Sequence, residues 1–251
     1  TSGITFGARM RLRSNENGAT LTTGARVYMK TGGLELAMGN INGAIESMPG
    51  LYDASLGLTG LGWGGLVTNN WDAAGTKAFD GWDAYSSSGN GAEGIEVTYT
   101  AGAFTGHLSY SDNAAGGLSS NGLNSGEERV AAYGAYTMND WTFALGLQDS
   151  DNNANDKTVV TVGGKIGDYG VGIAYADNDG VGKFALNGSA TFGATTVSAY
   201  VAKQASVLLI ANDMAYGLGV SYDLGGASVV GGISHDSAGV DRADLGVSFS
   251  F

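Results

Sequence analysis

The sequence of 251 residues has no cysteine, one proline, two histidines and only 14% charged residues. Without cysteine, the chain has neither disulfide bonds nor thiolate metal ligands. Long hydrophobic runs are also missing: the longest extends from Val207 to Ala211. A membrane-spanning helix needs roughly 20 consecutive apolar residues, so the sequence excludes a transmembrane helix.

Basic residues are scarce as well, with 12 lysines and arginines against 24 acids and a net charge of −12. This balance argues against nucleic acid as a partner, because phosphates would be repelled. Low charge combined with a mean hydropathy close to zero is typical of a β-barrel in lipid. In such a barrel alternate residues face hydrocarbon and water, so their hydropathies average out.

The sequence is rich in glycine, with 44 residues. Its apolar and polar residues alternate with a period of two. The first two predicted strands, before and after a polar turn at 15–18, each place their basic residues on one face. These residues are Arg9, Arg11 and Arg13 in the first strand, and Arg26 and Lys30 in the second. The opposite face carries apolar residues such as Phe6 and Val27, which predicts one lipid-facing and one water-facing side.

The alternation continues to the C-terminus and predicts about fourteen antiparallel strands, interrupted only between Asn40 and about residue 93. Short turns alternate with longer polar connections, as in an up-and-down transmembrane β-barrel. A soluble β-sandwich or propeller also has many short strands. It is disfavoured because the apolar face is nearly free of charge, and because aromatic residues cluster next to the short turns, as they do at membrane interfaces.

Three stretches resemble the general diffusion porins of alphaproteobacteria of the Rhodobacter type: residues 3–11, residues 191–197, and residues 216–251 with the terminal Phe251. The resemblance implies an outer-membrane channel for passive diffusion of small hydrophilic solutes and ions. It also implies sixteen strands, a homotrimer in contact with outer-membrane lipid and lipopolysaccharide, and a third loop folded into the pore. We therefore expect one porin domain over 1–251, with residues 41–93 as the loop and the first β-hairpin absent before Thr1.

A constriction implied by this family needs opposite charges across the pore. The basic side would consist of Arg9, Arg11, Arg13, Arg26 and Lys30, and the acidic side of Glu46, Asp53, Asp72, Asp80 and Asp83. The early acids Glu46 and Asp53 are favoured over the other three. The alternative is that the arginines only fill a polar lumen and cap loops.

No motif requires a cofactor, but the resemblance makes Glu46 and Asp53 candidate ligands of a calcium ion. A second acidic stretch, residues 149–153, resembles the start of a calcium-binding loop. Ala154 stands where that loop needs glycine and Val160 where it needs glutamate, so a solvated loop is the better interpretation.

Two other classes of function stay open. His107 and Ser109 share the polar face of one strand, which leaves an outer-membrane esterase as a weak alternative, since no orienting acid is identified. An adhesin or receptor barrel is the other; the strand number and the basic residues favour an open channel instead. The apolar run from Val207 to Ala211 has no assigned role.

Overall fold

The structure is a computed structural model of the chain. It describes residues 3–10, 12–14, 20–22, 24–63, 65–67, 93–112, 128–151, 156–178, 180–204, 214–236 and 239–249, without the side chains of 12–14, 20–22 and 93. Secondary structure in these residues is β-strand, turn and bend. No helix among them has the length and apolarity that crossing a membrane requires.

Most of the described chain is extended. The strands are β1 (Ile4–Arg9), β2 (Leu12–Ser14), β3 (Thr20–Thr22), β4 (Arg26–Thr31), β5 (Leu34–Asn40), β6 (Glu93–Ala101), β7 (Phe104–Asp112), β8 (Glu128–Met138), β9 (Trp141–Ser150), β10 (Lys157–Ile166), β11 (Tyr169–Asn178), β12 (Val181–Phe192), β13 (Thr195–Gln204), β14 (Met214–Asp223), β15 (Ala227–His235) and β16 (Asp241–Phe249).

Hydrogen-bonding partners follow the order of the chain, which gives a 14-stranded antiparallel sheet; β2 and β3 pair separately. The predicted number of strands is therefore confirmed. The first two predicted strands, however, are each divided in two. β1 ends at Arg9 and β4 begins only at Arg26, so Arg13, on β2, lies outside the large sheet.

Each long strand separates an apolar from a polar face, as the period of two predicts. In β9, Phe143, Leu145 and Leu147 are exposed on one side, while Ala144, Gly146 and Gln148 are buried on the other. On the apolar side of β1, Phe6 is 74% exposed. Large apolar side chains left uncovered along successive strands are expected where lipid, and not water, surrounds a sheet. We refer below to the apolar face and the polar face.

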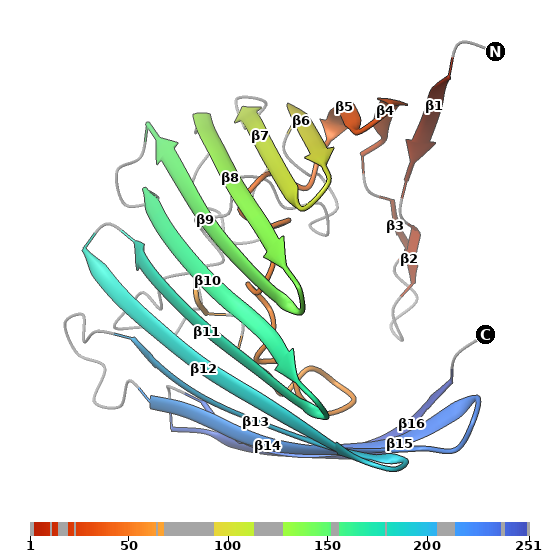
Figure 1. Ribbon diagram of the computed structural model, residues 1–251, viewed down its shortest axis with the longest axis vertical. Helices are drawn as coiled ribbons and strands as arrows, with labels where there is room; N and C mark the ends of the chain where they lie inside the picture. The colour runs from red at the N-terminus through yellow and green to blue at the C-terminus, as the bar shows by residue number, and fades with distance from the viewer. Residues whose placement is uncertain are drawn as a thin grey trace. The chain divides into compact units, whose positions relative to one another are not determined.

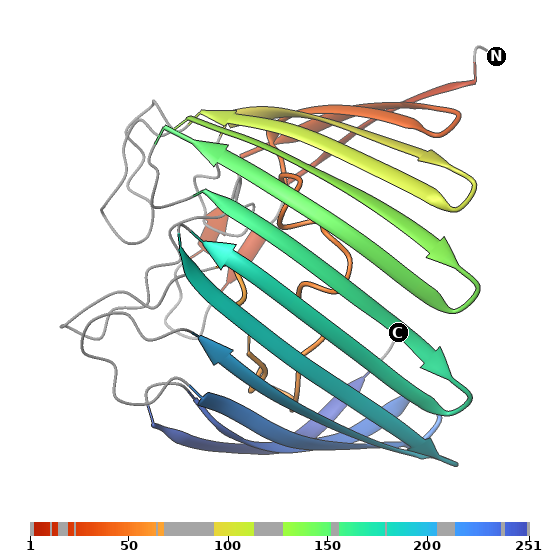
Figure 2. The ribbon, with the colours of Figure 1, turned by 60° about the vertical axis from the view of Figure 1, so that its left-hand side comes forward.

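Short turns join the strands in pairs, as β6–β7 and β10–β11 show in Figure 2. Tight hairpin turns need residues with positive φ, and Gly102, Gly167 and Gly193 supply them. Asn139, with φ of 53°, takes this position in the turn after β8. Of the aromatic residues predicted next to short turns, Trp141 is partly buried and the others are exposed: Tyr99, Phe104, Tyr136, Tyr169, Phe192, Tyr222 and Phe249.

Two compact units make up the chain. The first contains residues 1–48, 78–136 and 144–158. Within it, the chain leaves β5 and runs over the polar face, where Ile41, Ile45 and Met48 are buried. Glycines on that face make room for them: a Cβ at Gly146 would lie 2.9 Å from Ile45 Cδ1 and 2.7 Å from Met48 Sδ. The beginning of the predicted loop is thus packed onto the strands.

The second unit contains residues 49–77, 137–143 and 159–251, including the adjacent strands β11 to β16 (Figure 1). Its loop residues also bury apolar side chains, namely Leu51, Ala54, Leu56, Leu61, Leu66 and Val67. Gly217 and Gly219 on β14 accommodate Leu56, whose Cδ1 and Cδ2 would lie 2.6 Å and 3.2 Å from Cβ atoms added there. The described part of the long loop, residues 41–67, therefore lies against the polar face within each unit.

Candidate functional site

Basic side chains of β4 project from the polar face and are paired with glutamates of the neighbouring strands. Arg26 Nε donates to Glu96 Oε1 on β6 at 2.7 Å, and Arg26 Nη2 donates to Glu35 Oε1 on β5 at 2.7 Å. Lys30 Nζ lies 2.7 Å from Glu35 Oε2. The antiparallel register places Lys30 directly opposite Glu35. Arg26 and Lys30 are therefore held by acids of the neighbouring strands of the sheet.

Glu96 also connects this group to the start of the loop. Its Oε2 atom accepts a hydrogen bond from the Gly43 backbone N–H at 3.1 Å and lies 3.1 Å from His107 Nε2. The Ala44 backbone N–H donates to Ser109 Oγ at 2.9 Å. Glu96, His107 and Ser109 are all buried. The pair considered for esterase chemistry thus has a partner acid, but Ser109 binds the loop backbone, and His107 contacts the glutamate that also binds it.

Arg9 at the end of β1 is exposed and lies in the same unit. Its Nη2 atom is 3.3 Å from Asn42 Oδ1 of the loop. Between Arg9 and Lys30 lies Tyr28, whose ring is contacted by Lys30 Nζ at 5.0 Å from the centroid. The ring covers Gly7, where a Cβ would collide with it. Arg11 and the side chain of Arg13 lie outside the described residues.

Of the predicted loop acids, the structure describes two. Glu46 is partly buried in the first unit, and Asp53 is exposed in the second. Asp53 Oδ2 lies 3.4 Å from the position of a Cβ at Gly163, and the surrounding protein atoms displace enough water to raise the pKa of this carboxyl above its ordinary value. Asp72, Asp80 and Asp83 lie outside the described residues, as does the run from Val207 to Ala211.

The described residues do not support a calcium site. No three potential metal ligands of the His, Cys, Asp and Glu types come together among them. Calcium takes six to eight oxygen ligands, which Glu46 and Asp53 alone do not supply. Part of the second acidic stretch, residues 152–155, lies outside the described part of the chain. Calcium binding by Glu46 or Asp53 therefore stays a prediction.

In the second unit the loop is held by hydrogen bonds to its backbone carbonyl groups. Thr161 Oγ1 donates to Pro49 O at 2.6 Å, and Tyr200 OH donates to Leu61 O at 3.3 Å. Further along, Lys183 Nζ donates to Gly65 O at 2.7 Å and Asn178 Nδ2 to Leu66 O at 3.2 Å. Buried carbonyl groups need such partners, so these polar side chains fix the path of the loop along β10 to β13.

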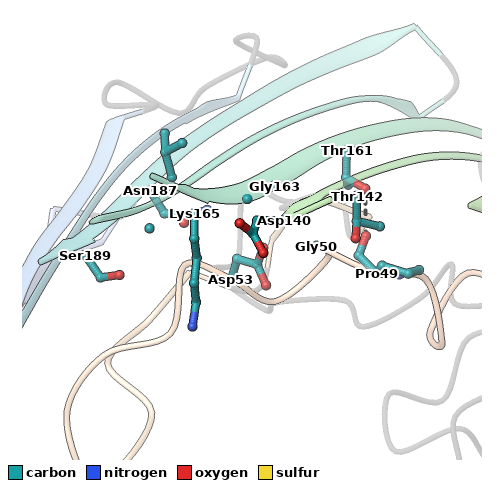
Figure 3. A pocket seen from close by; sticks show the side chains of 13 residues that line it. Pro49, Gly50, Asp53, Asp140, Thr142, Thr161, Gly163, Lys165, Asn187 and Ser189 are labelled. Carbon is teal, nitrogen blue, oxygen red and sulfur yellow. Dashed lines mark hydrogen bonds between the residues drawn. The ribbon is translucent and has the colours of Figure 1, made fainter. Parts of the chain in front are cut away.

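Between the loop and the polar face of the second unit lies a cavity of about 620 Å³ (Figure 3). Its charged lining residues are Asp53 on the loop, Asp140 in the turn before β9, and Lys165 on β10. Asn187 and Ser189 on β12 and Thr142 on β9 add amide and hydroxyl groups. Lys165 and Asp140 were not identified from the sequence.

The alternation of apolar and polar residues does indicate the direction of Glu35, Glu96 and Lys165, which were not predicted as site residues. Glu35 stands between Leu34 and Leu36, and Glu96 between Ile95 and Val97. A charged residue between two apolar ones in a strand points to the polar face. Lys165 precedes the apolar residue Ile166 and likewise lies on the polar face. The family resemblance points to acids of the loop, whereas the alternation by itself indicates Glu35 and Glu96 on the strands.

An antiparallel sheet with an apolar exposed face, and with charged side chains and a long loop on the polar face, defines the class of membrane β-barrel channels. The family model described as "Gram-negative porin" matches residues 1–248. The chain belongs to the Gram-negative porin family.

Known porins are similar to this chain over nearly its whole length. The chain is 32% identical to a porin of Rhodobacter capsulatus, covering 100% of this chain and 88% of that one. It is 29% identical to a porin of Fuscovulum blasticum, covering 99% and 85%. A solved structure of a mutant of Rh. blastica porin superposes with a TM-score of 0.77 at 28% identity, covering 99% and 85%. The protein is an outer-membrane diffusion channel, and the predicted Rhodobacter-type resemblance is confirmed.

Proposed function

We propose that the channel passes small hydrophilic solutes and ions through a water-filled constriction formed by residues 41–67 against the polar face. The observation that supports this most directly is the attachment of Gly43 and Ala44 to Glu96 and Ser109. A loop fixed to the water-facing side of a barrel narrows the path of any solute. Charged groups near such a constriction then decide which solutes pass.

Arg9 and Lys30 would contribute the positive charge at the constriction, because both are exposed on the polar face; Lys30 shares Glu35 with Arg26, so its charge is compensated in part. Arg26 is paired with Glu35 and Glu96, so its charge is largely compensated. The alternation assigns Arg11 and Arg13 to the same side, and the family resemblance assigns Asp72, Asp80 and Asp83 to the opposing loop. Among the acids, Asp53 is the best candidate because it is exposed to the cavity, whereas Glu46 is partly buried.

Ion selectivity in planar bilayers tests this arrangement. Replacing Lys30 and Arg9 together by glutamate should shift the reversal potential in a salt gradient toward cation selectivity, because the field at the constriction changes sign. Lys203→Glu is a matched control, since Lys203 is exposed on the apolar face of β13. An equal shift in the control would remove Arg9 and Lys30 from the constriction. A correctly folded protein that does not conduct would contradict the channel itself and favour an adhesin.

We also propose that the chain is a homotrimer and does not act as an enzyme. Diffusion through an open pore needs no catalytic group; Ser109 already binds the loop backbone, and His107 is engaged with Glu96. Chemical cross-linking in detergent should give a three-chain species, and a dimer or monomer would contradict the trimer. Ester hydrolysis that is lost in His107→Asn would contradict the absence of catalysis.

A solved neighbour described as "Asymmetric conductivity of engineered proteins" has a TM-score of 0.76 and 28% identity, over 99% of this chain and 85% of that chain. The description of this neighbour, a protein of the same fold, thus concerns conductivity. This supports the choice of conductance as the readout.

A further inference from the structure

The cavity in the second unit carries charge of both signs at its surface. Lys165 provides an ammonium group, and Asp53 and Asp140 provide two carboxylates. Figure 3 shows Asp53 next to Asp140, with Lys165 beside them on the same side of β10. All the lining residues belong to the second unit, so the cavity is complete within it.

The hollow exists because glycine occupies position 163 on the polar face of β10 and the successive positions 170 and 172 on the polar face of β11. A Cβ at Gly170 would lie 2.6 Å from Ser189 Oγ, and one at Gly172 would lie 2.5 Å from Asn187 Nδ2. These glycines stand opposite Ser189 and Asn187 in the register. With larger residues there, the polar groups of β12 would be pushed aside. The absent side chains at Gly163 and Gly170 leave room beside Lys165.

Within the described part of the chain, no hydrogen bond or ion pair engages the side chains of Asp53, Asp140 or Lys165. Other charged groups of the same unit are engaged: Lys183 donates to Gly65 O, and Arg242 lies 2.9 Å from Asp236. The raised pKa of Asp53 also indicates a carboxylate with too little compensating charge. A cationic group placed beside it would supply that charge.

We propose that this cavity is a binding subsite for small zwitterions that carry an ammonium group and a carboxylate, such as short peptides. The ammonium group of the solute lies between Asp53 and Asp140, and its carboxylate faces Lys165. Asn187, Ser189 and Thr142 hydrogen-bond the amides between them. The volume of about 620 Å³ falls within the 300–1,000 Å³ typical of small-molecule sites. This inference rests on the proposed function, because the solute reaches the cavity through the channel.

Binding must be weak, because solvent-exposed ion pairs contribute little and because a conducted solute has to leave again. We expect dissociation constants on the order of millimolar. Weak binding at a subsite next to the loop would slow zwitterions briefly and concentrate them on the route through the pore. A neutral solute of the same size would gain none of this attraction.

The test uses triglycine as the probe and its N-acetylated, amidated form as the neutral control of similar size. Triglycine should raise the single-channel current noise and lower the mean current with saturation, whereas the neutral peptide should not saturate. Isothermal titration calorimetry on the folded protein in detergent measures binding independently of conduction. Lys165→Met and Asp53→Asn should each weaken triglycine binding by about fivefold, corresponding to about 1 kcal/mol for an exposed charge pair.

Lys203→Met is the matched control and should leave triglycine binding unchanged. Gly163→Leu, which fills the hollow without changing any charge, should abolish saturation while the channel still conducts. Equal binding of the neutral peptide, or unchanged binding in Lys165→Met and Asp53→Asn, would overturn the subsite even if the channel conducts normally. A protein that binds triglycine in the calorimeter but does not conduct would retain the subsite and contradict the proposed function instead.

Discussion

The two described stretches of the loop are held to the strands by different chemistry. Residues 41–48 depend on a buried charged group, in which Glu96 bonds both Arg26 and the Gly43 N–H. Residues 49–67 depend on side chains that donate to backbone carbonyl groups, as Thr161 does to Pro49. Removing a charged acceptor that several donors share breaks several hydrogen bonds at once. Removing one of the side chains that donate to carbonyl groups breaks only one hydrogen bond.

The largest effect is expected from Glu96→Ala. This substitution leaves Arg26 and the Gly43 N–H without their partner in a buried setting, since Glu96 is 2% exposed. Breaking a buried charged pair by removing one partner costs about 3–5 kcal/mol. The free energy of unfolding, measured by urea titration in lipid vesicles, should fall accordingly. Glu35→Ala, at a more exposed pair, should cost about 1 kcal/mol. Equal losses of unfolding free energy in Glu96→Ala and Glu35→Ala would show that Glu96 does not hold the loop more strongly than Glu35 does.

A smaller effect is expected from Thr161→Val in the second stretch. Valine keeps the shape of threonine but cannot donate to Pro49 O, so we expect a loss of about 1 kcal/mol in the free energy of unfolding. Tyr200→Phe, which removes the longer bond to Leu61 O, should cost less than Thr161→Val. If either substitution costs as much as Glu96→Ala, the contrast between the two stretches is wrong.

The smallest effect is expected from the titration of Asp53. Its pKa in the folded protein is raised, so the proton is bound more tightly in the folded state. The corresponding stability is fully present below the ordinary pKa of aspartate and is lost as the pH rises through the raised value. Asp53→Asn should therefore slightly stabilise the protein at pH 7 and have no effect at pH 3. Stabilisation that is independent of pH would contradict this account.

The alternation of residues was sufficient to predict the number of strands, their polar and apolar faces, and the direction of Arg26 and Lys30. It could not predict the pairing of Arg26 with Glu96, because β4 and β6 are separated in the sheet by β5 and in the sequence by the long loop. That contact depends on the register across two strand pairs. The path of the loop was also beyond the sequence, since the hydrogen bond from Tyr200 OH to Leu61 O joins residues 139 positions apart in the chain.

The most direct test of the central claim, that the loop lies in a conducting pore, uses the absence of cysteine. Asp53→Cys introduces the only thiol in the chain, at an exposed loop position beside the cavity. A cationic methanethiosulfonate reagent added to the aqueous phase should lower the single-channel conductance of this variant and leave that of the wild type unchanged. Rapid modification of the thiol without any change in conductance would contradict the placement of the loop in the pore.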